Sequence, residues 1–325
     1  PTLKIRTMLS SPRAGLGLLT LALTAQCVAA FTTPSALGAS AFTKARSASS
    51  PALRTLPTHR ARPAVARTMA TLETEHPPQV NMGHPLPIVY VYDHCPFCVR
   101  ARAIFGIKNI KHEVRFMAND DIDTPTALVG KKIAPILSVP QKNEVMMESL
   151  DIVKRIDEDP TMGPSVLAPK TGRKDFNDWQ KKHQNLFRLL QRPRYVQSGL
   201  LPEFAMKGGR DAFVRNHPVP PFEKPDWKDD AKFTMKTRWD EYQKAMAQSP
   251  QLIAEANAAV QELEPLIYSA KHCSAGGLGY DDIELFARLR SLTIIKGLEC
   301  GPKLQGYLTY MSSKTDVPLY WQMAC

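Results

Sequence analysis

Two cysteines three positions apart are the residues of this sequence whose chemistry is easiest to recognise. Cys95 and Cys98 close the segment Tyr-Asp-His-Cys-Pro-Phe-Cys, and a helical pattern follows them. Thiols in the first turn of a helix meet unpaired backbone N–H groups and the positive end of the helix dipole, which favour a thiolate. We therefore expect Cys95, which comes first and should be the more exposed, to be the nucleophile. Cys98, one turn later, can close a disulfide onto it.

A strand, a tight turn and a helix are the elements needed to position this pair. Residues 88–92 are apolar and rich in β-branched and aromatic types, which predicts a buried strand. Beyond the cysteines, apolar residues recur at helical spacing, and Pro96 suits the first turn, where a missing N–H costs little. Gly106 is expected to end this helix.

Zinc binding and a structural disulfide are the alternatives for a Cys-x-x-Cys pair. A structural zinc site needs four ligands, but the sequence has no second Cys-x-x-Cys and no His-x3-His, and Cys273 and Cys300 stand alone. A structural disulfide is typical of short secreted chains with more cysteines. The strand and helix around the pair favour redox chemistry over both alternatives, and no metal site is expected.

The positive charge of the chain is concentrated near its start. The 325 residues carry a formal net charge of +11, but no Asp or Glu precedes Glu73. Nine of the 42 Lys and Arg residues lie in residues 1–72, which leaves 33 basic against 31 acidic residues in the rest. Because the sequence has no basic stripe interleaved with aromatic residues, no nucleic-acid partner is expected.

The first 85 residues have the composition of a targeting leader. After Met8, the candidate initiator, an apolar run at 16–23 ends in a small-x-small pattern at 28–30, as in a signal peptide, and is too short for a good membrane span. Residues 31–69, beginning with Phe31, are rich in Ser, Thr, Ala, Arg and Pro and resemble a plastid transit peptide.

The two parts together resemble the bipartite leader of algae with secondarily acquired plastids. We therefore expect import into a plastid, with a mitochondrial presequence or simple secretion as the alternatives. Residues 1–85 are expected to have no packed structure, and the protein is expected not to associate with a membrane once the leader is removed.

Residues 86–160 are predicted to form a thioredoxin-like α/β domain. Alternating and apolar segments predict three further strands, at residues 113–117, 135–137 and 145–147. A short helix should open at Asp123 and end at Gly130, and Ser149 is expected to cap a last helix. The resulting order β-α-β-α-β-β-α, with a hairpin at the end, is that of a thioredoxin fold.

Residues 161–173 are rich in Pro and Gly and are expected to be a linker to an all-helical domain, residues 174–325. Apolar residues recur at helical spacing in segments 176–190, 252–267 and 283–294. Pro193 is expected to stop the first of these helices, and Pro265 to kink or shorten the second. Residues 206–228, rich in Pro, Gly and charge, are expected to form a long loop.

Seven segments on both sides of the linker carry a family resemblance. They are residues 91–98, 104–110, 119–121, 132–137, 148–153, 281–286 and 289–293. In them the chain resembles the second type of bacterial glutaredoxin, over about residues 87–325. The resemblance implies a glutathione-transferase-like architecture, a thioredoxin-like domain followed by an all-α domain. It also implies glutathione-dependent reduction of protein disulfides and of glutathione mixed disulfides.

A glutathione site around the cysteine pair is also implied by the resemblance. Ala134-Pro135 matches a cis-proline loop, whose backbone would pair with the cysteinyl segment of glutathione beside Cys95. Glu148 would bind the γ-glutamyl ammonium group, and Ser149, at a helix start, the adjacent carboxylate. The implied glutathione-binding residues are Cys95, Pro96, Phe97, Ala134, Pro135, Glu148 and Ser149.

Glutathione is thus expected as a co-substrate, with no tightly bound cofactor. Disulfide-bearing or glutathionylated proteins are the expected partners of a monomer. A glutathione transferase and a glutathione-binding redox scaffold stay open as alternatives, but the intact Cys95–Cys98 pair favours the oxidoreductase, because a transferase has no use for a resolving thiol. One departure from the family pattern is Gly279, where a Ser-like helix cap is usual, which weakens a capping box there.

Overall fold

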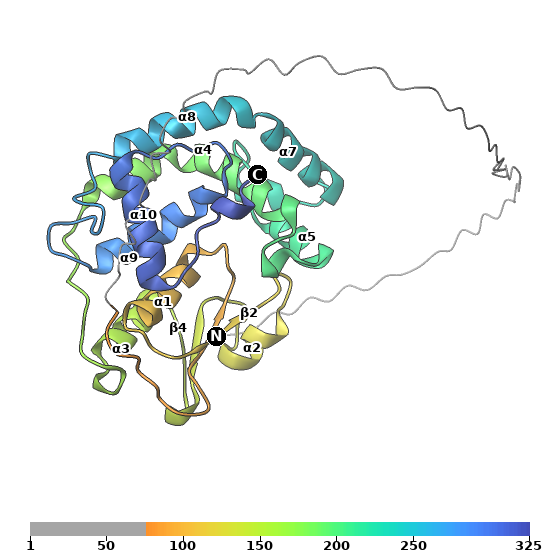
Figure 1. The fold of residues 1–325 in the computed structure, drawn as a ribbon. Coiled ribbons are helices and arrows are strands. Elements are labelled where there is room, and N and C mark those ends of the chain that lie inside the picture. Colours follow the sequence, from red (N-terminus) through yellow and green to blue (C-terminus); the bar gives the residue numbers. More distant parts are fainter. Residues whose placement is uncertain (1–75) are drawn as a thin grey trace, which may run out of the picture. The chain divides into compact units, whose positions relative to one another are not determined.

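The computed structural model describes residues 76–325, which belong to one compact unit (Figure 1). The predicted signal and transit peptides, with Met8 and Phe31, lie outside the described residues. Among the helices that residues 76–325 form, none has the length and apolar character needed to cross a lipid bilayer.

A four-stranded mixed sheet forms the first part of this unit. Its elements in chain order are β1 Ile88–Val91, α1 Pro96–Ile107, β2 Glu113–Phe116, α2 Asp123–Val129, β3 Ile136–Val139, β4 Glu144–Met147 and α3 Ser149–Glu158. The strand order is β2-β1-β3-β4, with β1 parallel to β2 and antiparallel to β3, and β4 closes a hairpin with β3. The predicted thioredoxin-like order of elements is therefore confirmed.

The two faces of this sheet are covered differently. Val89 and Val91 of β1 are fully buried with Leu137 and Val139 of β3, in a cluster that includes residues of α1 and α3. Tyr90 faces the other way and packs with apolar residues of α2 in a smaller cluster. This alternation places α1, with the cysteine pair at its start, against the better-buried face.

The second part is all-helical, as predicted. Its α-helices are α4 Lys174–Ser198, α5 Lys207–Asn216, α6 Lys224–Lys228, α7 Met235–Ala247, α8 Ser249–Leu263, α9 Tyr280–Leu289 and α10 Pro302–Thr315. The short 3-10 helices are η1 Pro140–Lys142, η2 Pro160–Met162, η3 Pro202–Phe204, η4 Arg290–Ile294 and η5 Trp321–Met323. Pro265 lies just beyond the end of α8, as expected of a residue that shortens a helix.

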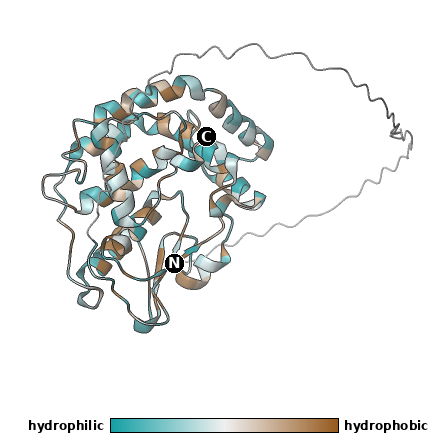
Figure 2. Ribbon diagram, viewed as in Figure 1, coloured by the Kyte–Doolittle hydropathy of each residue, from teal (hydrophilic) through white to brown (hydrophobic). Residues whose placement is uncertain are grey.

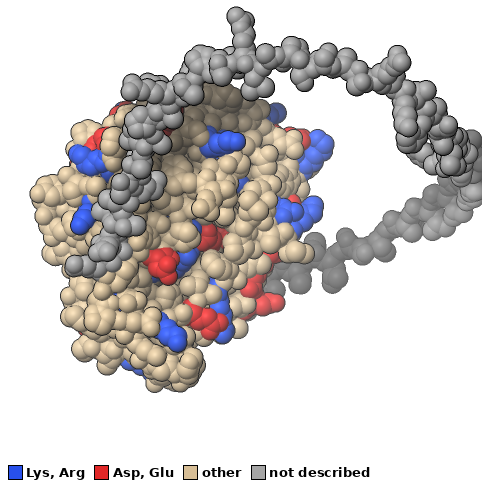
Figure 3. All heavy atoms as spheres, viewed as in Figure 1, with Lys and Arg blue, Asp and Glu red and all other residues tan. Residues whose placement is uncertain are grey.

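Hydropathy and charge follow this arrangement. Figure 2 shows hydrophobic and hydrophilic residues along the outer helices α7 and α8, as expected of helices with one buried face. On the face drawn in Figure 3, basic and acidic side chains are interspersed, and neither sign forms a large patch. That face therefore shows no broad basic area of the kind that binds nucleic acid.

Pro193 does not stop its helix, contrary to the prediction. It lies inside α4, which continues to Ser198 and ends at Gly199, whose φ is 62°. A proline in a helix interior costs about 3 kcal/mol. Tyr195 and Val196, beyond the proline, are both buried, and burying each large side chain contributes roughly 1.5–3 kcal/mol. The core contacts beyond the proline thus outweigh its cost.

Residues 206–228 are not a long loop, and this prediction was also wrong. They contain α5 and α6, held together by Trp227, which is fully buried and whose indole N–H donates to the Val214 carbonyl oxygen at 2.7 Å. The glycines that suggested a loop permit close packing instead. A Cβ atom at Gly209 would lie 2.3 Å from the Glu203 carbonyl oxygen.

Three further predictions need correction. Gly106 lies inside α1 instead of ending it. A Cβ atom there would lie 1.9 Å from the carbonyl oxygen of Thr315 at the end of α10, so this glycine permits close packing of the two helices. Ser149 is the first residue of α3 and not its cap; Glu148 precedes it with a φ of 74° and no capping hydrogen bond from its side chain. The end of the expected unpacked leader is packed, because Val80 bridges to Ile110 and contacts the core.

Candidate active site at the cysteine pair

Cys95 and Cys98 lie at the start of α1, as predicted. Cys95 is the residue that precedes the helix and is half-buried, whereas Cys98 is fully buried in the first turn. The backbone N–H of Tyr92 donates to the sulfur of Cys98 at 3.3 Å, and the N–H of Cys95 donates to the Tyr92 carbonyl oxygen at 3.3 Å. The tight turn therefore presents Cys95 to the surface and holds Cys98 behind it.

The two thiols are driven to opposite protonation states. A hydrogen bond from the Cys98 thiol, the charge of His94 and the backbone N–H groups of Phe97 and Cys98 lower the pKa of Cys95 to about 7, despite its burial. Burial, together with the neighbouring Cys95 thiolate, raises the pKa of Cys98 well above the ordinary thiol value. At neutral pH, Cys95 can therefore be the thiolate that attacks, while Cys98 stays a thiol.

His94, directly before the nucleophile, is held by a carboxylate from the helical part. The Oε1 atom of Glu203 in η3 lies 2.6 Å from His94 Nδ1 and accepts the His94 backbone N–H at 2.8 Å. Burial alone would raise the pKa of the Glu203 carboxyl, but these contacts with His94 hold it below its usual value. The His94 ring also contacts the rings of Tyr195, Phe204 and Phe213.

Asp93, in the same turn, ties the cysteine loop to the other end of the chain. Its buried carboxylate accepts hydrogen bonds from Arg102 at 2.6 Å, from Arg290 in η4 at 3.0 and 3.1 Å, and from the Tyr320 hydroxyl at 2.7 Å. Arg290 and Tyr320 also donate to the Asp93 carbonyl oxygen. This network fixes the turn from which Cys95 projects.

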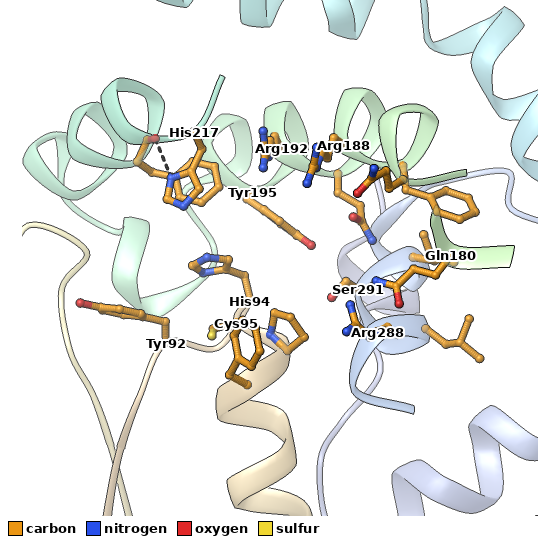
Figure 4. Close-up of a pocket in the computed structure, with 18 of the residues that line it drawn as sticks. Tyr92, His94, Cys95, Gln180, Arg188, Arg192, Tyr195, His217, Arg288 and Ser291 are labelled. Atoms are coloured by element: carbon orange, nitrogen blue, oxygen red, sulfur yellow. Dashed lines mark hydrogen bonds between the residues drawn. The ribbon is translucent and has the colours of Figure 1, made fainter. Parts of the chain in front are cut away.

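The cis-proline loop is present, because the Ala134–Pro135 peptide bond is cis, as predicted. Ala134 lines a pocket of about 490 Å³ together with Cys95, Pro96 and Phe97, so these four predicted site residues come together. Figure 4 shows Cys95 at this pocket. Pro135, Glu148 and Ser149 do not line this pocket. Glu148 is exposed, and Ser149 is buried at the start of α3.

The helical part supplies the opposite wall of this pocket, which the sequence analysis did not identify. Its lining residues from α4 onwards are Trp179, Gln180, Gln184, Phe187, Arg188, Gln191, Arg192, Tyr195, Phe213, His217, Arg288, Leu289, Ser291 and Leu292. The spacing of the polar residues in α4 was a usable signal, since Gln180, Gln184, Arg188 and Gln191 share one helical face beside the apolar stripe.

Tyr92, which lines the pocket, carries a buried polar atom without a partner in the described part of the chain. The Tyr92 hydroxyl makes no hydrogen bond with any described residue, although Tyr92 lines the pocket. Figure 4 shows this hydroxyl directed away from Cys95. Among residues 76–325, no three His, Cys, Asp or Glu side chains gather as they would to hold a metal ion.

The comparisons with known proteins cover both parts of the described unit. A family model described as "Glutathione S-transferase, N-terminal domain" matches residues 89–164, and one described as "Glutaredoxin 2, C terminal domain" matches residues 230–324. Glutaredoxin 2 of Escherichia coli (strain K12) is 33% identical over 238 residues, which cover 73% of this chain and 99% of that protein. The crystal structure of Glutaredoxin 2 from Salmonella typhimurium in complex with glutathione has a TM-score of 0.63 at 31% identity. The structural match covers 74% of this chain and 99% of the Salmonella chain.

Proposed function

The chain belongs to the glutaredoxin 2 family and is a glutathione-dependent oxidoreductase, and we propose that it reduces disulfides through Cys95 as nucleophile and Cys98 as resolving thiol. The observation that carries this assignment is the contrast between the two thiols. The pKa of half-buried Cys95 is lowered to about 7, and that of fully buried Cys98 is raised. Only one of them is thus suited to attack first.

The proposed reaction with a glutathione mixed disulfide needs Cys95 alone. Its thiolate attacks the glutathionyl sulfur, a new sulfur–sulfur bond forms, and the substrate thiolate leaves and takes a proton from water. A glutathione thiolate then attacks the same glutathionyl sulfur, releasing glutathione disulfide and regenerating the Cys95 thiolate. The two electrons that reduce the substrate come from glutathione.

A protein disulfide places a different demand on the site. Attack by Cys95 leaves the substrate tethered through a mixed disulfide, and Cys98 can release it by attacking the Cys95 sulfur from within the same helix turn. This step is intramolecular and so has a high effective concentration. Glutathione afterwards reduces the Cys95–Cys98 disulfide. The proposed partners are accordingly disulfide-bearing and glutathionylated proteins. This protein is proposed to act on them as a monomer.

We assign glutathione to the edge of the pocket formed by the thioredoxin-like part. Ala134 would pair with its cysteinyl backbone, while Glu148 and Ser149 would bind the γ-glutamyl end. The backbone of Glu148 supports this assignment, because a non-glycine residue at a φ of 74° is strained, and such strain persists mostly at functional sites. Glutathione is also the ligand named for the Salmonella protein.

The proposed location is a plastid. The support is the acid-free composition of residues 1–72 and the apolar run at 16–23. A fluorescent fusion of residues 8–85 should enter the plastid. Import that is unchanged by Phe31→Ala would remove the main support for a bipartite leader.

Turnover of the two substrate classes by cysteine variants tests the catalytic assignment. Oxidation of NADPH through glutathione reductase reports glutathione turnover for each. Cys95→Ser should abolish both reactions, whereas Cys98→Ser should keep much of the mixed-disulfide activity and lose most of the protein-disulfide activity. Cys300→Ser is the matched control and should change neither. A Cys95→Ser protein that still turns over would refute the assignment, and Cys273, Cys300 and Cys325 would then be examined.

A further inference from the structure

The pocket beside Cys95 is lined by basic side chains and by no carboxylate. Arg188 and Arg192 come from α4, and Arg288 comes from α9. No Asp or Glu belongs to the lining. Figure 4 shows the two α4 arginines on one side of the pocket and Arg288 on another, with Tyr195 between them and His94. His217 adds no charge at neutral pH, because burial lowers its pKa to about 3.

None of these three arginines forms an ion pair with a described residue. Arg188 reaches only the side-chain oxygen of Asn185, at 3.5 Å, and Arg192 donates to the Pro218 carbonyl oxygen. The carboxylate nearest to Arg288 in sequence is that of Glu284, one turn earlier in α9. Glu284 is already bound by Arg100 at 3.2 Å and by Lys170 at 2.5 Å. The charge of Glu284 also acts on Arg288, but no carboxylate forms an ion pair with any of the three arginines among the described residues.

This charge is also partly removed from water. Arg192 and Arg288 are half-buried, and burial is the main cause that lowers the pKa of each. A partly buried cation without a counter-charge is unfavourable until an anion reaches it. The side-chain amides and hydroxyl of Gln180, Gln184, Gln191 and Ser291 line the same pocket and can donate hydrogen bonds to a carboxylate.

A disulfide under attack by Cys95 needs space for two halves, the half that is retained and the half that leaves. The residues assigned to the glutamyl end of glutathione, Glu148 and Ser149, lie outside the pocket lining. The wall with the arginines is therefore open to the leaving half. A volume of about 490 Å³ suits a small molecule and not a folded domain, since small-ligand sites span roughly 300–1,000 Å³.

We propose that the arginine wall, Arg188, Arg192 and Arg288, binds the leaving half of the disulfide and selects small leaving halves that carry carboxylates. Among low-molecular-mass mixed disulfides of glutathione, those with an acidic thiol are then preferred. The arginines bind the carboxylates of the leaving half and favour departure of its sulfur as a thiolate. This inference rests on the proposed function and names the substrate class of the same site.

Four mixed disulfides of glutathione test the inference. Their leaving halves are cysteamine, 2-mercaptoethanol, 3-mercaptopropionate and mercaptosuccinate, whose charge runs from positive through neutral to doubly negative. For each, kcat/KM for the disulfide is measured by NADPH oxidation at fixed glutathione, for the wild type and for Arg188→Gln/Arg288→Gln. The wild-type to variant ratio on one substrate cancels the intrinsic reactivity of its leaving thiol.

We expect this ratio to rise with negative charge. It should reach roughly tenfold for mercaptosuccinate, which corresponds to about 1.4 kcal/mol, because hydrogen bonds to a charged carboxylate are the strong ones. It should stay near one for 2-mercaptoethanol and fall below one for cysteamine. Exposed Arg188 can be replaced alone if the double variant fails to fold, with a smaller effect in the same order.

Lys181→Gln is the matched control, since Lys181 is an exposed cation of α4 that does not line the pocket. It should leave all four rate constants unchanged. The inference is overturned if the arginine variant loses the same factor on every substrate, or if Lys181→Gln changes the selectivity equally. Failure of the wild type to reduce the 2-mercaptoethanol disulfide would instead refute the proposed function itself.

Discussion

At the scale of single residues, the environment of Cys95 combines local and distant contributions. The turn and the first helical N–H groups come from its own sequence neighbourhood, and so does Cys98. His94 is a neighbour in sequence as well, but its orientation depends on Glu203, 109 residues away. The nucleophile is thus tuned in part by the helical part of the molecule.

A substitution at His94 measures that contribution. His94→Gln keeps a side-chain amide that can donate to Glu203 but removes the charge that favours the Cys95 thiolate. The pKa of Cys95 should therefore rise from about 7 toward the ordinary thiol value of about 8.5. The fraction of thiolate at pH 7 should fall, and alkylation of Cys95 by iodoacetamide should slow several-fold at that pH.

The full pH profile of alkylation separates this effect from a loss of fold. The midpoint should move to higher pH, while the limiting rate at high pH stays close to that of the wild type. His183→Gln is the control, because His183 lies on α4 beside Glu262 and outside the pocket. An unchanged midpoint in His94→Gln would show that His94 does not tune the thiol.

The sequence identified the residues whose roles depend on local spacing and failed for those that depend on distance along the chain. Cys95, Pro96 and Phe97 share one turn, and the Ala134–Pro135 loop was recognised by resemblance. Glu203 and Arg288 approach the cysteines only through the packing of helices. No local pattern marks a residue for a contact that forms more than a hundred positions away.

At the scale of elements, periodicity predicted which segments fold and was less reliable about where they end. The sequence analysis interpreted Pro193 and Gly106 as helix ends, and the prolines and glycines of 206–228 as signs of a loop. In each case tertiary packing decides instead, because a buried side chain or a close backbone approach lies across the expected boundary. Position 106 requires a glycine because the end of α10 packs against it. The sequence of α1 alone does not show this contact.

Gly279, which precedes α9, tests the same competition between local helix signals and tertiary packing. The carboxylate of Asp282 accepts the Gly279 N–H at 3.0 Å, so half of a capping box is formed. A serine would add the missing cap, which contributes only about a few tenths of a kcal/mol relative to glycine. However, a Cβ atom at Gly279 would lie 2.5 Å from the backbone carbonyl oxygen of Ala168, and such overpacking costs typically 1–3 kcal/mol. Gly279→Ser should therefore destabilise the protein.

Urea unfolding measures this difference directly. Gly276→Ser is the matched control in the same loop, since nothing lies closer than 4.0 Å to a Cβ atom there, and its midpoint should stay that of the wild type. A Gly279→Ser protein with a higher midpoint would show that the cap outweighs the contact with Ala168.

At the scale of the whole described unit, the two parts share their cores. Val99 of α1 belongs to the cluster of buried residues of the helical part, and Ile283 of α9 belongs to the cluster under the sheet. Asp93 and Arg290 join the parts again beside the active site. We therefore expect the thioredoxin-like and helical parts to unfold together.

Arg290→Gln should weaken both parts at once. The guanidinium is 1% exposed and donates three of the hydrogen bonds that fix Asp93. Breaking a buried pair costs about 3–5 kcal/mol, and the lower end is expected because Arg102 and Tyr320 stay bound to Asp93. Tryptophan fluorescence reports the helical part, which holds Trp179, Trp227, Trp239 and Trp321. Labelling of buried Cys98 reports the other part, and both transitions should shift by the same amount.

The loss of stability in Arg290→Gln should also depend on pH, in a direction set by the pKa of Asp93. Burial alone would raise the pKa of Asp93, but Arg290, Arg102 and Tyr320 together hold it below the ordinary value. Asp93 therefore contributes stability above its unfolded pKa of about 3.9, and this contribution is lost as the pH falls through the folded pKa. The difference in stability between wild type and Arg290→Gln should accordingly be largest near neutral pH and shrink in acid.

Arg115→Gln is the control for this prediction. It removes an exposed pair with Glu113 and should show no such difference at any pH. If Cys98 became accessible in Arg290→Gln while the tryptophan transition stayed in place, the two parts would be independent, and the Asp93–Arg290 contact would serve only the cysteine turn.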